Sequence, residues 1–365
     1  MVRAMTGRQK LFLIGPRRFG KTSILNVAQQ EAHAKGAVVL RHDAEAYPTF
    51  EALVNAIIAS AARELTTAIK RTSEQVVKFF GTLRPQVTFD ATSHTWSASL
   101  GVGDRRAEKS AALLVDALEG IAKMAADIDR PVALVIDEFQ HLIEVGGETV
   151  ERQLRATIQR HSRVSYIFAG SKTALLDDMT LNPARPFYRL GTRLFLGPIP
   201  RKDFGDAIRK GFARARFTID ADALEHLFEL AEDVPYNVQA LANMSWEVVR
   251  AQDAQGRLTV GGLAHALDRL VSQDSPFYSK LWNLCTQPQQ RALTAVAVAR
   301  GKGLYAQEVL HRFRQSPSLM TKSLNALASR DIIRREESVA EVRWRLEDPF
   351  FSAWLAKVGA LPTGA

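Results

Sequence analysis

The chain has 365 residues, of which 46% are hydrophobic and 24% charged, an ordinary globular composition that is long enough for two or three domains. No apolar run approaches the length needed to cross a bilayer, the first residues lack the core of a signal peptide, and the single cysteine, Cys285, excludes an internal disulfide or a multi-cysteine zinc site. We therefore expect a cytoplasmic protein without a membrane contact.

The formal net charge is +9, and it is unevenly distributed. The segment 285–365 carries 12 lysines and arginines against 7 acidic residues, so more than half of the excess positive charge lies in the last fifth of the chain. A nucleic-acid partner would explain a basic C-terminal region, and a solvated basic face is the alternative.

The first predicted strand, 10–14, leads into the motif G-x-x-x-x-G-K-T, and a helix is predicted for 22–34. In this context the motif predicts a phosphate-binding P-loop, because glycines let the backbone approach a phosphate and the helix N-terminus adds positive potential. Lys21 would reach the β- and γ-phosphates, and the Thr22 hydroxyl would hold Mg²⁺. A chance glycine turn is the alternative, which the flanking strand and helix disfavour. The predicted nucleotide-binding residues are Gly15, Pro16, Arg17, Arg18, Phe19, Gly20, Lys21, Thr22 and Ser23.

After the P-loop helix, residues 37–41 predict a second buried strand, and 49–65 predict a long amphipathic helix capped by Thr49. Between about 84 and 103, two segments alternate apolar and polar residues, which predicts a β-hairpin inserted in the α/β domain. This hairpin is either a contact surface or a local structure without a partner. A further helix is predicted for 109–128.

The next buried strand ends in two carboxylates. Five apolar residues, 132–136, precede Asp137 and Glu138. In a P-loop ATPase, Asp137 would hold the Mg²⁺ shell from across the site, and Glu138 would polarise the attacking water as a general base. A buried strand that ends in a solvated acidic turn is the alternative, and the position of this strand downstream of a P-loop disfavours it.

A helix over 149–161, a strand over 164–169 and a fifth strand over 193–196 complete the predicted core. Five strands that alternate with helices predict a parallel, doubly wound sheet. Ligands bind such sheets outside the carboxyl ends of the strands, and the P-loop, Asp137, Glu138 and Ser171 all follow such ends. Ser171 is therefore a candidate for sensing the γ-phosphate.

The remaining chain predicts helices and one late hairpin. Four helical patterns without a clear strand, 202–215, 220–232, 236–254 and 260–271, predict a small helical domain. Three further helices, 287–299, 305–313 and 317–330, precede two strands, 332–335 and 342–346. That order is typical of a winged helix-turn-helix. Ser316 and Pro317 supply an N-cap and an N1 proline for its third helix, which presents Ser318, Thr321, Lys322 and Asn325 outward.

Taken together, these motifs resemble the prokaryotic archaeal-type AAA+ ATPases, which belong with the signal-transduction ATPases with numerous domains and, more distantly, with archaeal origin-recognition initiators. The resemblance spans residues 11–355. It implies an α/β P-loop NTPase core with a parallel five-stranded sheet of AAA+ type over 1–198, a helical lid over 199–274 and a C-terminal winged helix-turn-helix over 275–358. The segments that carry it are G-P-R-R-F-G-K-T-S (15–23), I-D-E-F-Q (136–140), F-A-G-S-K (168–172), P-F-Y-R-L-G (186–191), L-G-P-I-P (196–200) and P-Y-N-V-Q (235–239).

The resemblance also implies ATP as the nucleotide, Mg²⁺ as its metal, and Glu138 with Lys21 as the catalytic pair. Ser171 matches the sensor position, and Pro235 resembles the lid proline that packs near the nucleotide. The family often has glycine two residues before this proline, where the present chain has Asp233.

Two arginines, Arg185 and Arg189, are candidates for contacting the γ-phosphate, in cis or from a neighbouring subunit. Their alternative role is to form structural ion pairs, and the sequence does not decide between the two roles.

We therefore expect an ATP-binding and ATP-hydrolysing molecular switch that couples nucleotide state to a DNA or protein partner, with a homo-oligomer as one arrangement. The alternative is a DNA-binding regulator whose nucleotide site only tunes affinity. The winged helix would contact double-stranded DNA or serve as a protein-interaction or autoinhibitory module. The DNA-contact candidates are Lys322, Arg334, Arg335 and Arg343.

Overall fold

The computed structural model describes residues 1–69, 86–90, 95–99, 106–171, 173–252, 256–337 and 342–361. The chain divides into two compact units, 1–197 and 198–365. The predicted division into three domains stays a prediction, and helix α11 (Val260–Asn283) continues through the predicted second boundary at 274.

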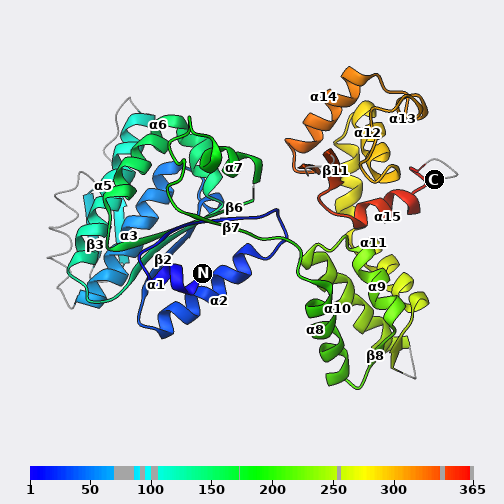
Figure 1. The fold of residues 1–365 in the computed structure, drawn as a ribbon, viewed down its shortest axis with the longest axis horizontal. Helices are drawn as coiled ribbons and strands as arrows, with labels where there is room; N and C mark the ends of the chain where they lie inside the picture. Colours follow the sequence, from blue (N-terminus) through cyan, green and yellow to red (C-terminus); the bar gives the residue numbers. More distant parts are fainter. Residues whose placement is uncertain are drawn as a thin grey trace. The chain divides into compact units, whose positions relative to one another are not determined.

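The first unit is built on a five-stranded sheet whose strand order is β2-β5-β6-β1-β7, visible as the long arrows in Figure 1. Every pair in it is parallel. The predicted parallel five-stranded sheet is therefore confirmed. Its strands are β1 (Lys10–Ile14), β2 (Val38–Asp43), β5 (Val132–Asp137), β6 (Val164–Gly170) and β7 (Thr192–Phe195).

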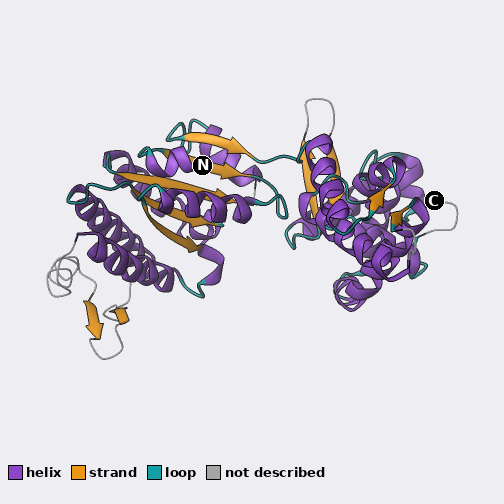
Figure 2. Cartoon of the chain, turned by 90° about the horizontal axis from the view of Figure 1, so that it is seen from below, coloured by secondary structure: helices purple, strands orange, loops and turns teal. Residues whose placement is uncertain are grey.

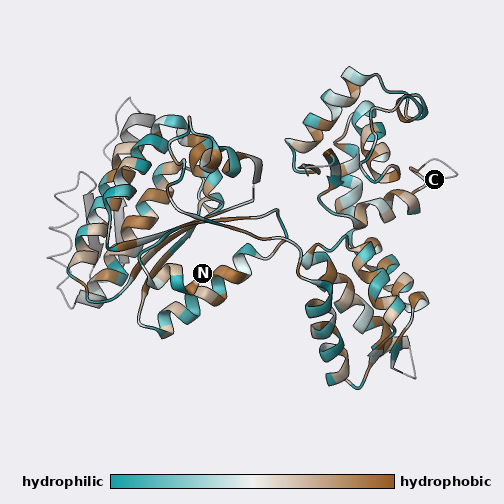
Figure 3. Ribbon diagram, in the orientation of Figure 1, coloured by the Kyte–Doolittle hydropathy of each residue, from teal (hydrophilic) through white to brown (hydrophobic). Residues whose placement is uncertain are grey.

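Apolar residues alternate between the two faces of this sheet, because successive strand residues point to opposite sides. On β1, Phe12 joins one buried cluster and Leu13 the other. Three long helices cover the first face and two shorter ones the second (Figure 2). Figure 3 shows that hydrophilic residues (teal) alternate with hydrophobic ones (brown) along these helices. These helices are α3 (Phe50–Ile69), α5 (Arg106–Ala126) and α6 (Phe139–Arg160) on one side, and α1 (Val2–Thr6) and α2 (Lys21–Ala34) on the other.

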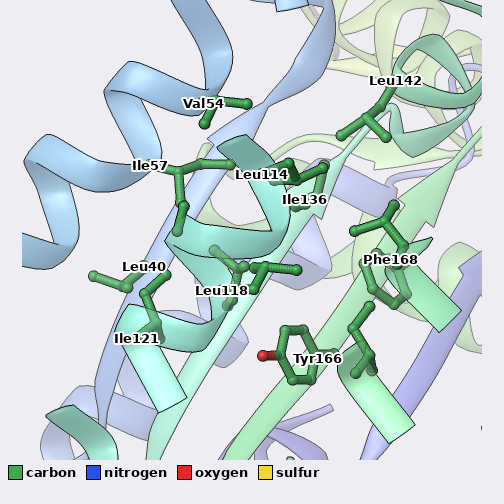
Figure 4. Packing of buried hydrophobic residues seen from close by; sticks show 14 of the residues in the cluster. Leu40, Val54, Ile57, Leu114, Leu118, Ile121, Ile136, Leu142, Tyr166 and Phe168 are labelled. Atoms are coloured by element: carbon green, nitrogen blue, oxygen red, sulfur yellow. The ribbon is translucent and has the colours of Figure 1, made fainter. Parts of the chain in front are cut away.

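Figure 4 shows part of the cluster on the first face, to which the helix residues Ile57 and Leu118 and the strand residues Tyr166 and Phe168 all belong. All four side chains are fully buried or nearly so. At about 25 cal/mol per Å² of apolar surface, each such side chain stabilises the fold by roughly 1.5–3 kcal/mol relative to exposure. This packing fixes where the carboxyl ends of β5 and β6 lie.

Helix α6 is longer than its prediction, because it begins at Phe139, directly after Glu138. Its backbone is not helical at Gly147, where φ is +63°, a conformation that glycine favours. This kink separates a first helical segment, which the sequence did not predict, from a second one that agrees with the helix predicted over 149–161. The Thr49 cap is confirmed, since the Ala52 N–H donates to Thr49 Oγ1.

An antiparallel hairpin, β3 (Gln86–Asp90) with β4 (Thr95–Ser99), lies where the inserted hairpin is predicted. The rest of that predicted segment, including its turn at 91–94, lies outside the described residues. The unit also contains the short elements η1 (Ala44–Ala46) and α7 (Thr173–Leu181).

The second unit begins with helices and contains a small strand pair that the sequence did not predict. Residues 218–219 pair in parallel with 257–258, a pairing too short to produce a strand pattern in the sequence. The elements are α8 (Arg201–Arg214), β8 (Thr218–Ile219), α9 (Ala221–Leu230), α10 (Pro235–Gln252), β9 (Arg257–Leu258) and α11.

The winged helix-turn-helix order is confirmed in the last part of the chain. Ser316 Oγ accepts the Leu319 N–H at 3.2 Å, Leu324 and Leu327 are fully buried, and Lys322 is exposed. A final helix, which the sequence did not predict, packs its aromatic residues on α11. The elements are α12 (Gln287–Val298), α13 (Gln307–Arg312), α14 (Pro317–Ala328), β10 (Ile333–Glu337), β11 (Val342–Leu346) and α15 (Phe350–Lys357).

His42 on β2 gives the first unit a pH-dependent stability. Its Nε2 lies 2.8 Å from Ser60 Oγ, and burial, with the charge of Arg63 adding, lowers the pKa of His42 from 6.5 to about 4. Between pH 6.5 and about 4, His42 is protonated in the unfolded chain but neutral in the folded one. The stabilisation of the folded state by neutral His42 is therefore fully present above pH 6.5 and is lost as the pH falls toward 4. We expect His42 to lower the free energy of unfolding by about 3 kcal/mol over that range.

Urea denaturation followed by circular dichroism at pH 7, 5.5 and 4.5 measures this loss. A His42→Gln variant, which keeps a partner for Ser60, should lose less stability on acidification than the wild type. An identical pH dependence in the two proteins would contradict the assignment.

Candidate functional site

The P-loop connects the end of β1 to the start of α2. Gly20 caps the helix with φ +83°, and a Cβ placed there would meet nothing within 4 Å. A Cβ on Gly15 would lie 2.9 Å from Leu196 Cβ, so the first glycine is required by close packing. Lys21 is only 5% exposed, and its Nζ donates to the carbonyls of Gly15 at 3.0 Å and Pro16 at 3.2 Å. The loop is therefore closed around a buried ammonium group.

Asp137 ends β5 next to this loop. The Asp137 Oδ2 atom accepts hydrogen bonds from Thr22 Oγ1 at 3.2 Å and from Arg41 Nη2 at 3.0 Å. Asp137 is only 2% exposed. A carboxylate this deeply buried needs such charged and hydrogen-bonding partners. The structure thus brings the two predicted metal-binding residues, Thr22 and Asp137, into direct contact. It also adds Arg41, which the sequence analysis missed.

Glu138 is held by the end of the neighbouring strand β6. Its Oε2 accepts from Ser171 Oγ at 2.8 Å and from the Ser171 N–H at 3.3 Å, and Gln140 Nε2 donates to the same oxygen. Its Oε1 lies 4.0 Å from Lys21 Nζ. The backbone of Glu138 is left-handed, with φ +47°, where it caps α6. One carboxylate oxygen is therefore fixed, and the other faces the P-loop lysine.

The strand order explains this gathering. Because β6 lies between β5 and β1, Ser171 follows the strand that separates Asp137 from the P-loop. Gln140, the second residue of α6, bridges Glu138 and Ser171. The sequence offered no signal for this role of Gln140, since it depends on which strands are neighbours.

The two candidate arginines lie elsewhere in the first unit. A Cβ on Gly191 would lie 2.3 Å from the Lys10 carbonyl, so the loop containing Arg189 packs at the start of β1. The P-loop follows the other end of that strand, about 13 Å away at 3.3 Å per residue. The structure therefore does not bring Arg189 to the P-loop of its own chain, and a contact from a neighbouring subunit stays a prediction. Figure 1 lets the reader follow both ends of the sheet.

Arg185 forms ion pairs within its own unit. Its Nη2 lies 2.7 Å from Oε2 of Glu151, which is fully buried, and its Nη1 lies 3.5 Å from Asp178 Oδ2. Burial raises the pKa of Glu151, and the Arg185 charge opposes that rise. This geometry is that of the structural ion pair named as the alternative in the sequence analysis.

We expect Arg185→Leu to lower the free energy of unfolding by about 3–5 kcal/mol at pH 7, because it leaves a buried carboxylate without its partner. The deficit should shrink as the pH falls, because burial raises the pKa of Glu151 and its protonation removes the uncompensated charge. Urea denaturation measures both effects. The double variant Arg185→Leu/Glu151→Leu should recover most of the loss, and wild-type stability in the single variant would contradict the pairing.

In the second unit, Asp233 stands where the resembling family often has glycine. Its φ is +57°, a left-handed conformation that favours glycine. The carboxylate is held by Arg201 in a two-point pair, with Nε at 2.7 Å from Oδ1 and Nη2 at 2.8 Å from Oδ2, and this pair raises the pKa of Arg201. Pro235, two residues later, begins α10, and its proximity to a nucleotide stays a prediction.

The DNA-contact candidates have different surroundings. Lys322 is exposed on α14. Arg334 has a side chain 12% exposed and is paired with Glu336 and Glu347. Arg343 donates to the Arg300 carbonyl at 2.8 Å. Arg335 is exposed on the same strand as Arg334. On this wing, therefore, part of the predicted positive charge is internally compensated.

Within the described ranges, no helix is both long enough and apolar enough to cross a membrane.

Comparisons with known proteins give two family matches and several similar folds. Residues 2–168 match the AAA ATPase domain family, and residues 276–357 match a family described as a probable winged helix domain. A curated relative, the ATP-dependent RNA helicase HAS1 of Candida albicans, is 27% identical over 155 residues, which cover 40% of this chain and 26% of the relative. The match thus spans about a quarter of that relative's length.

Among solved structures, the Walker-type ATPase of Pyrococcus abyssi is similar over 97% of this chain and 94% of its own, with a TM-score of 0.59 and 15% identity. The ORC2 protein of Aeropyrum pernix, solved as ADPNP-ADP complexes, is similar over 98% of this chain and 91% of its own, with a TM-score of 0.53 and 14% identity. At these identities the likeness shows the fold alone.

These matches confirm the predicted resemblance to AAA+ ATPases. They also confirm the predicted fold class, an α/β P-loop domain followed by a C-terminal winged helix. The chain thus joins a P-loop domain of AAA+ fold, which matches the AAA ATPase domain family over residues 2–168, to a C-terminal domain that matches a probable winged helix domain.

Proposed function

We propose that the chain is a Mg²⁺-dependent switch that binds and hydrolyses ATP at the P-loop. The observation that carries this proposal is the convergence of four side chains at the carboxyl edge of the sheet: Thr22 contacts Asp137 at 3.2 Å, and Lys21 lies 4.0 Å from Glu138. The AAA ATPase domain match supports nucleotide binding and ATPase chemistry. The ADPNP-ADP complexes of the Aeropyrum pernix protein support an adenine nucleotide.

The residues present fit a phosphate chain and its metal. The space beside Gly20 is open, with nothing within 4 Å of a Cβ built there. The Thr22 hydroxyl and the Asp137 carboxylate are the hard oxygen donors that Mg²⁺ prefers, together with phosphate oxygens. When bound, Mg²⁺ would neutralise charge that develops on the phosphates. Arg41, which shares Asp137 Oδ2 with Thr22, would hold this carboxylate in place.

The catalytic step rests on Glu138. Ser171 and Gln140 fix its Oε2, so the carboxylate plane is set and Oε1 faces the P-loop. We propose that Oε1 accepts a proton from the attacking water while Lys21 binds the phosphate oxygens. In this proposal Ser171 positions the general base through its hydrogen bond to Glu138. It senses the γ-phosphate only indirectly, through Glu138.

One glycine supports this arrangement. A Cβ on Gly170 would lie 2.2 Å from Gln140 Oε1 and 2.6 Å from Leu176 Cδ1. We expect Gly170→Ala to displace Gln140 and so lower ATP turnover by roughly tenfold, with ATP affinity nearly unchanged. Steady-state hydrolysis at saturating ATP measures the effect. Gly197→Ala is the control, because a Cβ there meets nothing within 4 Å; unchanged turnover in the Gly170 variant would contradict the role of Gln140.

We further propose that nucleotide state is coupled to a DNA or protein partner through the winged helix domain. Steady-state ATP hydrolysis with and without duplex DNA tests this coupling. Turnover that rises with DNA supports a DNA-coupled ATPase, and turnover indifferent to DNA supports a protein partner.

The second candidate function is a DNA-binding regulator in which nucleotide only tunes affinity. The basic C-terminal region favours it. It predicts salt-sensitive binding to duplex DNA without measurable ATP turnover, whereas the proposed switch requires turnover.

A further inference from the structure

A cavity of about 470 Å³ lies in the winged helix domain, away from the wing. It is bounded by α12, by the turn between α13 and α14, and by the last described residues of the chain. We call it the arginine groove, after Arg291, Arg312 and Arg314; Gln287, Gln290 and Trp282 also line it. No acidic side chain is among its lining residues.

The three arginines have no carboxylate partner in the part of the chain that the structure describes. Arg312 and Arg314 are exposed and Arg291 is half-buried. None of the three guanidinium groups forms an ion pair with a residue in the described ranges of the chain. The only contact of the Arg312 guanidinium recorded there is with the Phe313 ring, at 5.8 Å. Three like charges around one cavity repel one another unless water or an anion compensates them.

The wing shows the opposite pattern. Arg345 on β11 is paired with Glu336 at 2.6 Å and also with Glu232, and Arg334 is paired with Glu336 and Glu347. Burial and hydrogen bonds already engage these guanidinium groups. A new anion would therefore have to displace a carboxylate at Arg334 or Arg345, whereas the three groove arginines pair with no carboxylate of the described residues.

The local fold holds the groove in place. Gln315 Nε2 donates to the Pro288 carbonyl at 2.9 Å, which ties the α13–α14 turn to the start of α12. Arg314 has φ +50°, so the turn is sharp, and Ser316 caps α14 directly after it. The guanidinium groups therefore project from a braced turn and a helix, not from a loose tail.

We propose that the arginine groove is a phosphate-binding site. Guanidinium groups offer paired N–H donors that match phosphate oxygens, the Gln287 amide adds a further donor, and the volume exceeds that of one phosphate group. This inference deepens the partner part of the proposed function. The phosphate has two possible sources: the backbone of duplex DNA, or a free phosphorylated small molecule.

Two full-length triple variants test the proposal. The groove variant is Arg291→Gln/Arg312→Gln/Arg314→Gln, and the wing variant is Lys322→Gln/Arg335→Gln/Arg343→Gln. Both remove three positive charges, so nonspecific electrostatic effects cancel between them. Thermal denaturation checks that both fold. Binding to a fluorescein-labelled 20-base-pair duplex is measured at several salt concentrations, and binding of inorganic tripolyphosphate is followed by tryptophan fluorescence, because Trp282 lines the groove.

The tripolyphosphate titrations are made in a Lys21→Ala background, so that the P-loop does not contribute. If DNA is the source, the groove variant should lose at least tenfold in duplex affinity and its salt slope should fall by about 2–3, while the wing variant changes less. If a small molecule is the source, tripolyphosphate should alter the fluorescence and the groove variant should abolish the change, without duplex binding.

The proposal is overturned if neither probe separates the groove variant from the wing variant, or if the wing variant loses as much affinity as the groove variant. Basal ATP hydrolysis by the groove variant with Lys21 intact is measured in parallel. This rate should equal that of the wild type. If the groove proposal is wrong, the binding assays show no difference while hydrolysis persists; if the proposed ATPase function is wrong, hydrolysis is absent from the wild type as well.

Discussion

Glu138→Gln should abolish ATP turnover while leaving ATP affinity within a factor of about three. Glutamine keeps the shape and can still bond to Ser171, but it cannot take a proton from water, and general-base catalysis contributes about 10²–10⁴-fold. The atom proposed to take the proton is Oε1 of Glu138, 4.0 Å from Lys21 Nζ. The substitution replaces this charged carboxylate with a neutral amide. Single-turnover hydrolysis and equilibrium binding of ATP measure the two properties separately.

Glu148→Gln is the matched control for this prediction. Glu148 lies on α6, the helix that Glu138 caps, but its side chain is 58% exposed and is paired with Arg152. Its loss should leave turnover unchanged. Turnover of the wild-type magnitude in the Glu138 variant would show that another group is the base.

Lys21→Ala should weaken ATP binding by about 10–100-fold and eliminate turnover. Charged hydrogen bonds contribute about 1.5–3 kcal/mol, and Lys21 is the buried cation of the loop, bonded to the carbonyls of Gly15 and Pro16. Calorimetric titration with ATP and ADP measures the loss of affinity.

Lys35→Ala, at the other end of α2, is the control for charge. Lys35 is exposed, and its removal changes the net charge by the same amount without touching the loop. If both variants bind ATP as the wild type does, the nucleotide does not bind at the P-loop.

The central strands β1, β5 and β6 could be predicted because they are buried on both faces and therefore form continuous apolar runs. The same reasoning located the P-loop, Asp137 and Glu138, since each follows such a run. Helix α6 was predicted only in its second part, over 149–161. Its first part, from Phe139 to the kink at Gly147, was not predicted, since no capping side chain marks its start.

The partners of the site residues could not be predicted. Arg41 reaches Asp137 because β2 lies beside β5, and Ser171 reaches Glu138 because β6 lies beside β5. Strand order is a long-range property that local sequence does not specify. For the same reason the sequence shows how many basic residues the winged helix has, but not that Arg334 is paired with carboxylates whereas Arg312 has no such partner among the described residues.

The most direct test of the central claim is ATP hydrolysis by the wild-type chain as a function of Mg²⁺, from excess chelator to millimolar metal. The geometry of Lys21, Thr22, Asp137 and Glu138 predicts turnover that requires both ATP and Mg²⁺ and stops in the chelator. An absence of both ATP binding and turnover at every Mg²⁺ concentration would contradict it.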